Sequence, residues 1–389
     1  MASPDAGSDF PGADMEIDLL PGGQPLRDEI RAYLAAHHDP ARLDDILAGA
    51  PGYDPQLWAG LGREGWLQFG LPGARIGDLA VLASELGRAR VPTPLHGGLV
   101  QPAWAATGAD AAHAVGVLAG VTDGSTRVAL CLAGPAGRVA PGSLGVRVHR
   151  AGTAVRLDGV KRYVPFADSA GVLVVCADDA GGGVSLVAVP ADADGLAVEP
   201  APSVAGDRQA EVRLVDVEVG ADAVIGPEGG AWDAVHRAVL VGTVALCAEA
   251  VGASAALVDR AVERATTRQL FGGPLGRLQA VQHRCADMAL DQLAAVGAVD
   301  DAVACLDAGR PAGAVVAAAK VQCGTACLRI AASAHQLWGG TGYLADAGLH
   351  HWTRLIKGID AQLGGARDQR RSLVALLGKE RGWSTHALG

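Results

Sequence analysis

The sequence is poor in aromatic residues and in lysine. Only 4% of its 389 residues are aromatic, although half are apolar, and lysine occurs just four times. Alanine and glycine must therefore fill much of the core, which predicts helices that approach one another closely. The length allows a large core and predicts two or three domains.

The sequence also has no run of basic residues. The formal net charge is −10, and nearly all of the positive charge comes from arginines scattered along the chain. A nucleic acid or an anionic membrane surface needs a cationic patch on its partner. We therefore expect neither to be a main partner.

Cysteines are few and scattered. There are seven, an odd number, and no Cys-x-x-Cys pair. Cys323 and Cys327 lie four residues apart, but no second pair or nearby His completes a metal-ligand pattern. The sequence predicts reduced core cysteines in a cytoplasmic protein, no disulfide framework and no metal site.

Targeting and membrane segments are not expected either. Residues 1–20 lack the basic and apolar regions of a secretory signal, and we expect a disordered start. Residues 238–258 are apolar and long enough to span a bilayer. However, they contain Glu249, are rich in Gly and Ala, and continue into a polar stretch, so we predict a soluble helix.

The hydrophobic period changes twice along the chain. Apolar residues recur at helical spacing up to about residue 122, then short β-rich runs separated by Gly, Asp and Pro follow. From about residue 229 the pattern is helical again. We predict an α+β multidomain protein with an N-terminal helical domain (1–122), a middle antiparallel β-domain forming a sandwich or barrel (123–228) and a C-terminal four-helix bundle (229–389).

The pattern also predicts individual elements. Helices are expected at 25–37, 56–66, 78–91, 112–121, 232–270, 278–306, 312–338, 349–363 and 366–379. Strands are expected at 127–133, 145–151, 153–159, 171–177, 184–190 and 210–219.

Glu249 is the one charged residue in 238–258. On a helix, five of its six neighbours at three, four and seven residues are Gly or Ala, which leaves room for another helix or a flat ligand. A secluded carboxylate suits removal of a carbon-bound proton. The alternative is a structural ion pair with an arginine of a neighbouring helix, for which Arg354 and Arg284 are candidates.

Two glycine-containing stretches are candidates for phosphate binding. Residues 268–283, RQLFGGPLGRLQAVQH, place Arg268 beside a flexible turn, and an arginine can bind a phosphate through two hydrogen bonds. Residues 335–344, HQLWGGTGYL, form a Gly-rich loop after a helix, whose backbone N–H groups can surround phosphates. Each stretch can equally be an ordinary turn or helix end.

These stretches resemble the acyl-CoA dehydrogenase family. RQLFGGPLGRLQAVQHRCADM is similar to its Arg-x-x-Phe-Gly…Phe-Gln-x-x-x-His…Ala-Asp-Met segment, with Leu278 in place of Phe, and HQLWGGTGY resembles its Gln-x-x-Gly-Gly-x-Gly-Tyr loop. GLPG, ELGRARVPTP and two middle segments are also similar. The resemblance covers nearly the whole chain and implies the same α–β–α order.

The resemblance implies FAD bound across a subunit interface. Arg268 would contact the pyrophosphate, and Phe271 and Gln279 would line the adenylate side. Gln336, Gly339 and Gly340 would reach an FAD held mainly by the neighbouring subunit. The implied reaction is α,β-desaturation of an acyl-CoA thioester, in which a carboxylate takes the α-proton, the flavin takes a β-hydride, and an electron-transfer flavoprotein then accepts the electrons.

The sequence departs from the family pattern at the position of the catalytic base. The two usual positions align here with Leu363 and Gly242, neither of which carries a carboxylate. Glu249 lies two turns beyond Gly242 on the same face and resembles the Ala-Glu-x-x-Gly stretch of actinobacterial members linked to steroid side chains and bulky acids. We therefore assign the base to Glu249, with Asp360 as the weaker candidate.

The middle segment departs as well. The family's Glu-Pro-x-x-Gly-Ser-Asp stretch reads AGPAGRVA here, and the flavin-side strand reads YVPFA, with Tyr163 and Pro165. Two hypotheses follow. The chain is an FAD-dependent dehydrogenase for a bulky or branched acyl-CoA, acting as a homotetramer or in an α2β2 heterotetramer. Alternatively, it is a non-catalytic partner subunit that completes the FAD site of a second dehydrogenase-like chain.

Overall fold

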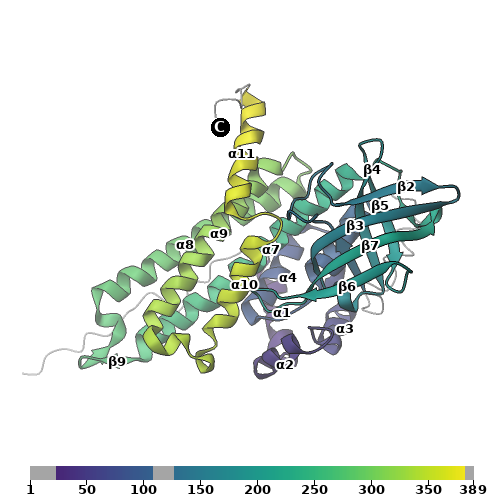
Figure 1. The fold of residues 1–389 in the computed structure, drawn as a ribbon. Helices are drawn as coiled ribbons and strands as arrows, with labels where there is room; N and C mark the ends of the chain where they lie inside the picture. The colour runs from purple at the N-terminus through teal and green to yellow at the C-terminus, as the bar shows by residue number, and fades with distance from the viewer. Residues whose placement is uncertain (1–22, 108–126, 382–389) are drawn as a thin grey trace, which may run out of the picture.

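The structure, a computed structural model, describes residues 23–107 and 127–381 (Figure 1). The start expected to be disordered and the helix expected at 112–121 lie outside these residues. In the described residues the predicted order of helices, strands and helices is confirmed. The domain boundaries at 122/123 and 228/229 stay predictions.

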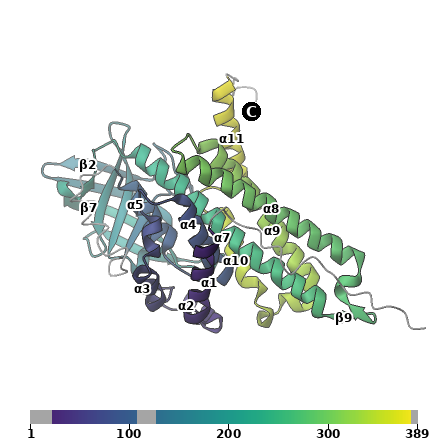
Figure 2. The same cartoon turned by 180° about the vertical axis from the view of Figure 1, so that it is seen from behind.

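Helices make up the first part of the chain. They are α1 (Gln24–His37), α2 (Leu43–Ala48), α3 (Pro55–Arg63), α4 (Ile76–Ala89) and α5 (Gln101–Ala105), with a π-turn, η3 (Leu95–Val100), before α5. The start of α4 is held by helix α8 (Gln279–Asp307) of the bundle, because the Ile76 N–H donates to Asp307 Oδ1 at 2.7 Å. Its end is fixed by Arg90, whose left-handed backbone stops the helix. Figure 2 shows these helices over the junction between the sheet and the bundle.

The middle part is one eight-stranded sheet. Its strands are β1 (Val128–Cys131), β2 (Val146–Ala151), β3 (Ala154–Pro165), β4 (Val172–Asp179), β5 (Val184–Pro190), β6 (Leu196–Ala201), β7 (Gln209–Gly220) and β8 (Val224–Ile225). The order is β6-β7-β3-β2-β4-β5-β8, with β1 beside β4. The sequence pattern missed β6, whose residues are half-exposed or exposed and include a Glu and a Pro.

The pairing corrects the expectation of a purely antiparallel sheet. Most neighbours are antiparallel, but β4 runs parallel to both β1 and β2. Parallel neighbours need a long connection, and the β2–β3 hairpin lies within the segment that joins β1 to β4. The sheet is therefore mixed.

Two apolar clusters lie on opposite faces of the sheet. Along β4, Val174 and Cys176 point to the cluster shared with the helices, whereas Leu173, Val175 and Ala177 point to the second. The second cluster also takes residues from β2, β3, β5 and β7, so the curved sheet encloses it. The central strand β4 is thus buried on both faces, which explains its continuous apolar sequence.

The last part is helical. It comprises α7 (Trp232–Thr267), α8 (Gln279–Asp307), α9 (Gly313–Trp338), α10 (Leu349–Ala361) and α11 (Ala366–Arg381), and the two-residue strands β9 (Gln269–Leu270) and β10 (Gly273–Pro274) connect α7 to α8. The helices α7 to α10 lie side by side beyond the sheet in Figure 1.

Two of these helices are long and apolar enough to cross a membrane. They span Trp232–Thr267 and Gly313–Tyr343, and their most apolar windows are 78% and 56% buried inside the protein. In this fold α7 contacts α4, α8, α9 and α10. Its apolar surface is therefore satisfied by protein, as expected for a core helix.

Candidate active site

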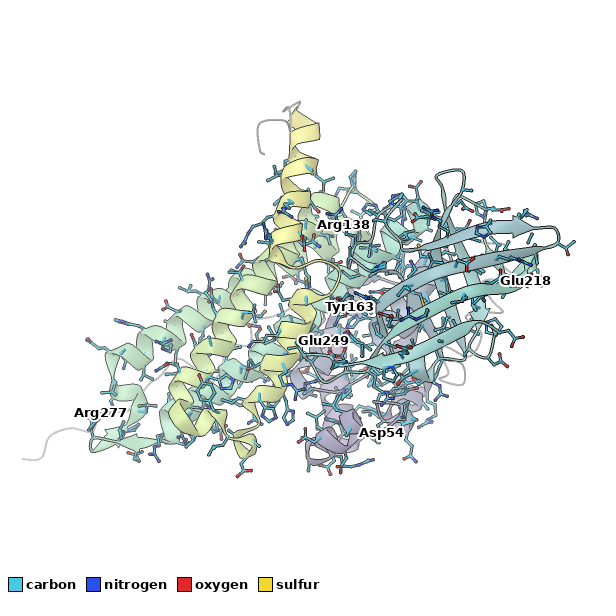
Figure 3. The ribbon with its side chains drawn as sticks, viewed as in Figure 1. Asp54, Arg138, Tyr163, Glu218, Glu249 and Arg277 are labelled. Atoms are coloured by element: carbon cyan, nitrogen blue, oxygen red, sulfur yellow. The ribbon has the colours of Figure 1, made fainter. Side chains whose placement is uncertain are left out.

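Glu249 lies in the middle of α7, where helices and sheet meet (Figure 3). The small residues around it admit another helix. A Cβ on Gly252 would lie 1.8 Å from Ser84 O of α4, and a Cβ on Gly87 would lie 2.1 Å from Glu249 O. The groove expected from the Gly/Ala stripe therefore exists, and at these two positions helix α4 fills it.

The carboxylate of Glu249 faces His96. Glu249 Oε2 lies 2.6 Å from His96 Nε2, and each side chain is 12% exposed. The expected structural alternative, an ion pair with Arg354 or Arg284, is wrong. Arg354 donates instead to Val204 O, and Arg284 lies on the exposed face of α8.

A cavity of about 40 Å³ adjoins this pair. Arg90 and Asp207 bring further charge to it. Burial raises the pKa of the Asp207 carboxyl, although a hydrogen bond from Ser203 and the charge of Arg90 oppose the rise. Burial lowers the pKa of the Arg90 guanidinium, which donates to His351 O at 3.1 Å and Ala205 O at 2.9 Å. The cavity therefore combines charged side chains with an apolar lining.

A second cavity, of about 440 Å³, adjoins the first through their shared lining residues Pro165 and Gln362. Its sheet side includes Leu132 and Tyr163, and its helix side includes Leu363. Most of its lining is apolar or glycine, and polar side chains such as Gln101 and Gln362 complete it. A slot of this kind between a sheet and a helix end suits a flat ring system.

The two usual base positions differ in their surroundings here. Leu363 lines the large cavity with a left-handed φ of 54°. Gly242 is covered by Gln101, whose Cγ would lie 2.9 Å from an added Cβ. The weaker candidate Asp360 points away from both cavities, because its carboxylate packs against Gly324 of α9. Its position does not support a role as the base.

The six cofactor candidates lie at the other end of the bundle. The side chains of Arg268, Phe271, Gln279 and Gln336 are all exposed, and so are Gly339 and Gly340. Phe271 is 86% exposed. The 335–344 loop contacts the end of α7, just before the 268–283 stretch, since Arg264 Nη2 donates to Thr341 Oγ1 at 3.2 Å and its guanidinium stacks over Trp338.

These candidates are far from Glu249 within one chain. Nineteen residues of α7 and its end separate Glu249 from Arg268, which corresponds to about 29 Å of helix. Figure 3 shows the same separation, with Arg277 of the 268–283 stretch at the far end of the bundle from Tyr163. One chain therefore cannot place both groups around the same flavin ring.

Sequence reasoning missed three residues of the site: His96, Arg90 and Asp207. The Pro-x-Pro and Gly-Gly that flank His96 mark a special turn, and this was the one available signal. Nothing in the local sequence indicates that this turn reaches α7, because His96 and Glu249 are 153 residues apart.

Asp44, His350 and His351 form a group of candidate metal ligands whose donor atoms lie within 4.8 Å of one another. The surroundings do not favour a cation. The positive charges of Arg90 and Arg354 act on His351 and would repel a metal ion, against the attraction of Asp44. We assign no metal to this group.

The chain is similar to known proteins over most of its length. Residues 229–376 match the model of the acyl-CoA dehydrogenase C-terminal domain. Acyl-CoA dehydrogenase IpdE2 of Mycolicibacterium smegmatis is 26% identical, over 90% of this chain and 97% of its own. Residues 229–376 therefore belong to the acyl-CoA dehydrogenase family, and the chain as a whole is similar to its members. Members of this family are flavoprotein oxidoreductases that act on the CH–CH group of an acyl-CoA.

Solved structures of the family share the whole fold. The Tcur3481-Tcur3483 steroid ACAD, in the form of a glycine-to-alanine variant, superposes with a TM-score of 0.83 and 28% identity over 92% of this chain and 98% of its own. The ChsE4-ChsE5 complex of Mycobacterium tuberculosis superposes with a TM-score of 0.82 and 22% identity over 93% and 97%. At 22% identity, the similarity to the ChsE4-ChsE5 complex shows a shared fold. Both structures are described as assemblies of two named components.

Proposed function

We propose that this protein catalyses the FAD-dependent α,β-desaturation of a bulky or branched acyl-CoA, such as a thioester of a steroid side chain. Glu249 would take the α-proton. The observation that carries the proposal is the adjacency of the two cavities, because it places a secluded carboxylate beside a slot fit for a flat ring.

The large cavity fits the flavin ring of FAD. Its walls are the apolar faces of β1 and β3 on one side and the Gly358–Gly364 segment on the other. A Cβ on Gly137, at the edge of the slot, would meet Tyr163 at 3.7 Å. Where the family strand carries a hydroxyl, Pro165 has none, so the contacts here would come from backbone and apolar groups. When bound, the flavin would accept the β-hydride.

The chain's own residues would prepare the proton transfer. Glu249 is held on a helix with its side chain only 12% exposed, and the adjoining cavity is small, at about 40 Å³, so little water can surround the carboxylate. Excluding water strengthens electrostatic interactions at the reacting carbon. Leu363 contributes apolar surface to the flavin slot in place of the usual carboxylate.

A neighbouring subunit would complete the cofactor site. The exposed Arg268 would bind the pyrophosphate of an FAD whose ring lies in another chain, with Phe271 and Gln279 along the adenylate. Gln336, Gly339 and Gly340 would approach the same FAD. Their separation from Glu249 supports this sharing, in a homotetramer or an α2β2 heterotetramer. An electron-transfer flavoprotein would then reoxidise the flavin, and we expect the protein in the cytoplasm.

A second candidate function has its own support. Leu363 and Gly242 leave the usual base positions without a carboxylate, and two of the similar structures contain two named components. The chain would then be a non-catalytic subunit that lends Arg268 and the Gln336–Gly340 loop to a partner's FAD.

Glu249→Gln tests the first function against the second. Gln keeps the size of the side chain and the contact to His96 but cannot accept the proton. We expect unchanged flavin content and a loss of flavin reduction by acyl-CoA of about 10²- to 10⁴-fold, the usual contribution of a general base. Full activity of the variant would exclude Glu249 as the base, and it would favour the partner-subunit role if the wild-type protein supports flavin reduction only together with a second subunit.

A further inference from the structure

His96 and Glu249 come from different elements and meet at the site. His96 belongs to η3, between α4 and α5, and Glu249 to the middle of α7. Their contact, at 2.6 Å between Nε2 and Oε2, is short for an N···O hydrogen bond. Both side chains line the small cavity. The chain therefore brings an imidazole to the carboxylate that we propose as the base.

The other ring nitrogen indicates how the proton is placed. His96 Nδ1 is buried and has no hydrogen-bond partner among the described residues. A buried N–H without an acceptor is more costly than a buried lone pair without a donor. The arrangement thus favours a neutral ring with its proton on Nε2, donated to an ionised Glu249.

The contact with His96 occupies Oε2 of the Glu249 carboxylate and leaves the second oxygen, Oε1, available. In the described part of the chain no hydrogen bond reaches Glu249 Oε1. We infer that His96 is a positioning residue, which fixes the carboxylate through Oε2 so that Oε1 faces the α-proton of the substrate. This inference rests on the proposed function of Glu249.

His96 is the one described residue whose hydrogen bond to the Glu249 carboxylate is observed, although Thr93 and Gln362 also line the cavity. Arg90, at the end of α4, and Asp207, between β6 and β7, act on Glu249 through charge. Their hydrogen bonds go elsewhere, Arg90 to backbone carbonyls and Asp207 to Ser203. The residues that α10 and the sheet contribute to this cavity are uncharged. The orientation of Glu249 therefore depends on His96.

Two variants of His96 separate hydrogen bonding from packing. His96→Phe keeps a ring but has no donor, whereas His96→Gln retains an N–H that can reach the carboxylate. A matched control is Ser254→Ala, on helix α7 like Glu249. This variant loses a buried hydrogen bond outside the site, from Ser254 Oγ to Gln292 Oε1 (2.7 Å). The control should lose stability without losing rate.

The assay is anaerobic single-turnover reduction of the flavin-loaded oligomer, purified with any co-expressed second subunit. The probes are the CoA thioesters of cholanic acid and isobutyric acid, each with and without deuterium at the α-carbon. We expect His96→Phe to slow flavin reduction by about 10- to 100-fold, as for a misplaced catalytic group. The α-deuterium isotope effect should rise, and His96→Gln should recover most of the rate. A merely structural defect would lower the reactive fraction and leave both rate and isotope effect unchanged.

A second readout does not depend on activity. Magic-angle-spinning NMR of protein carrying ¹⁵N-histidine, with His96→Gln to assign the signal, reports which ring nitrogen is protonated. We expect protonation on Nε2 alone. Protonation on Nδ1, or on both nitrogens, would overturn the inference.

The outcomes separate the inference from the proposed function. Reduction of the wild-type flavin together with an unaffected His96→Phe variant would refute the positioning role alone. Failure of both thioesters to reduce the wild-type flavin would refute the proposed function, and the catalytic role of the pair with it, whatever the tautomer of His96.

Discussion

Helix packing at Gly252 leads to a prediction with a built-in control. Gly252 of α7 faces the backbone of α4, where an added Cβ would lie 1.8 Å from Ser84 O. Real Cβ atoms essentially never come closer than 3.0 Å to such an atom, so α4 and α7 would have to separate by more than 1 Å. Overpacking of this kind costs about 1–3 kcal/mol. Gly252→Ala should therefore lower the free energy of unfolding despite the better helix propensity of alanine.

Gly297 of α8 supplies the control. It also lies inside a helix, but an added Cβ meets no atom of the chain within 4 Å. Gly297→Ala should raise stability by about 0.5–1 kcal/mol, because alanine loses less conformational freedom on folding. Urea or thermal unfolding of the two variants should shift in opposite directions. Equal stability of both would refute the close approach of α4 to α7 and, with it, the placement of Glu249.

Two further predictions concern cofactor and pH. Arg268→Met should reduce the amount of FAD retained on purification without changing the unfolding temperature. Arg277→Met, on the same segment, should retain as much FAD as the wild type. Flavin quantified after acid release measures the FAD content of both variants. Lys161 is fully buried and donates to Leu132 O and Leu144 O, and burial lowers its pKa to about 8. In the unfolded chain Lys161 keeps its proton up to about pH 10.5, whereas in the folded protein it loses the proton above about pH 8. The free energy of unfolding of the wild type, relative to that of Lys161→Met, should therefore rise between about pH 8 and 10.5, by up to about 3 kcal/mol. Lys357→Met, on an exposed face of α10, should show no such difference; parallel pH profiles of all three proteins would contradict the burial of an ionisable Lys161.

Much of the fold follows from local patterns. The 3.6-residue period marked the helices well, and the predicted helix over 232–270 is observed as Trp232–Thr267. Arg268 adopts an extended conformation that ends it. Strand β6 was missed because its residues are only partly buried and their sequence shows little apolar alternation.

Pairing and contact depend on tertiary structure, which local patterns do not carry. The parallel pairs of β4 join residues 44 positions apart with β1 and 31 positions apart with β2. The glycine-rich stripe around Glu249 indicated close approach, but sequence could not distinguish a ligand from helix α4. The contact of Glu249 with His96 links distant segments, so neither spacing nor composition predicts it. The roles of Glu249 and of the six cofactor candidates stay predictions.

The central claim is that this chain forms a flavin slot beside a working base. The most direct test is the visible spectrum of the protein purified alone, with FAD quantified after acid release, followed by anaerobic titration with the CoA thioester of cholanic acid. The account predicts about one FAD per chain and bleaching of the flavin by the thioester. A colourless protein that stays colourless with added FAD would contradict it and would support the non-catalytic partner role, for which co-expression with a second dehydrogenase-like chain is the next experiment.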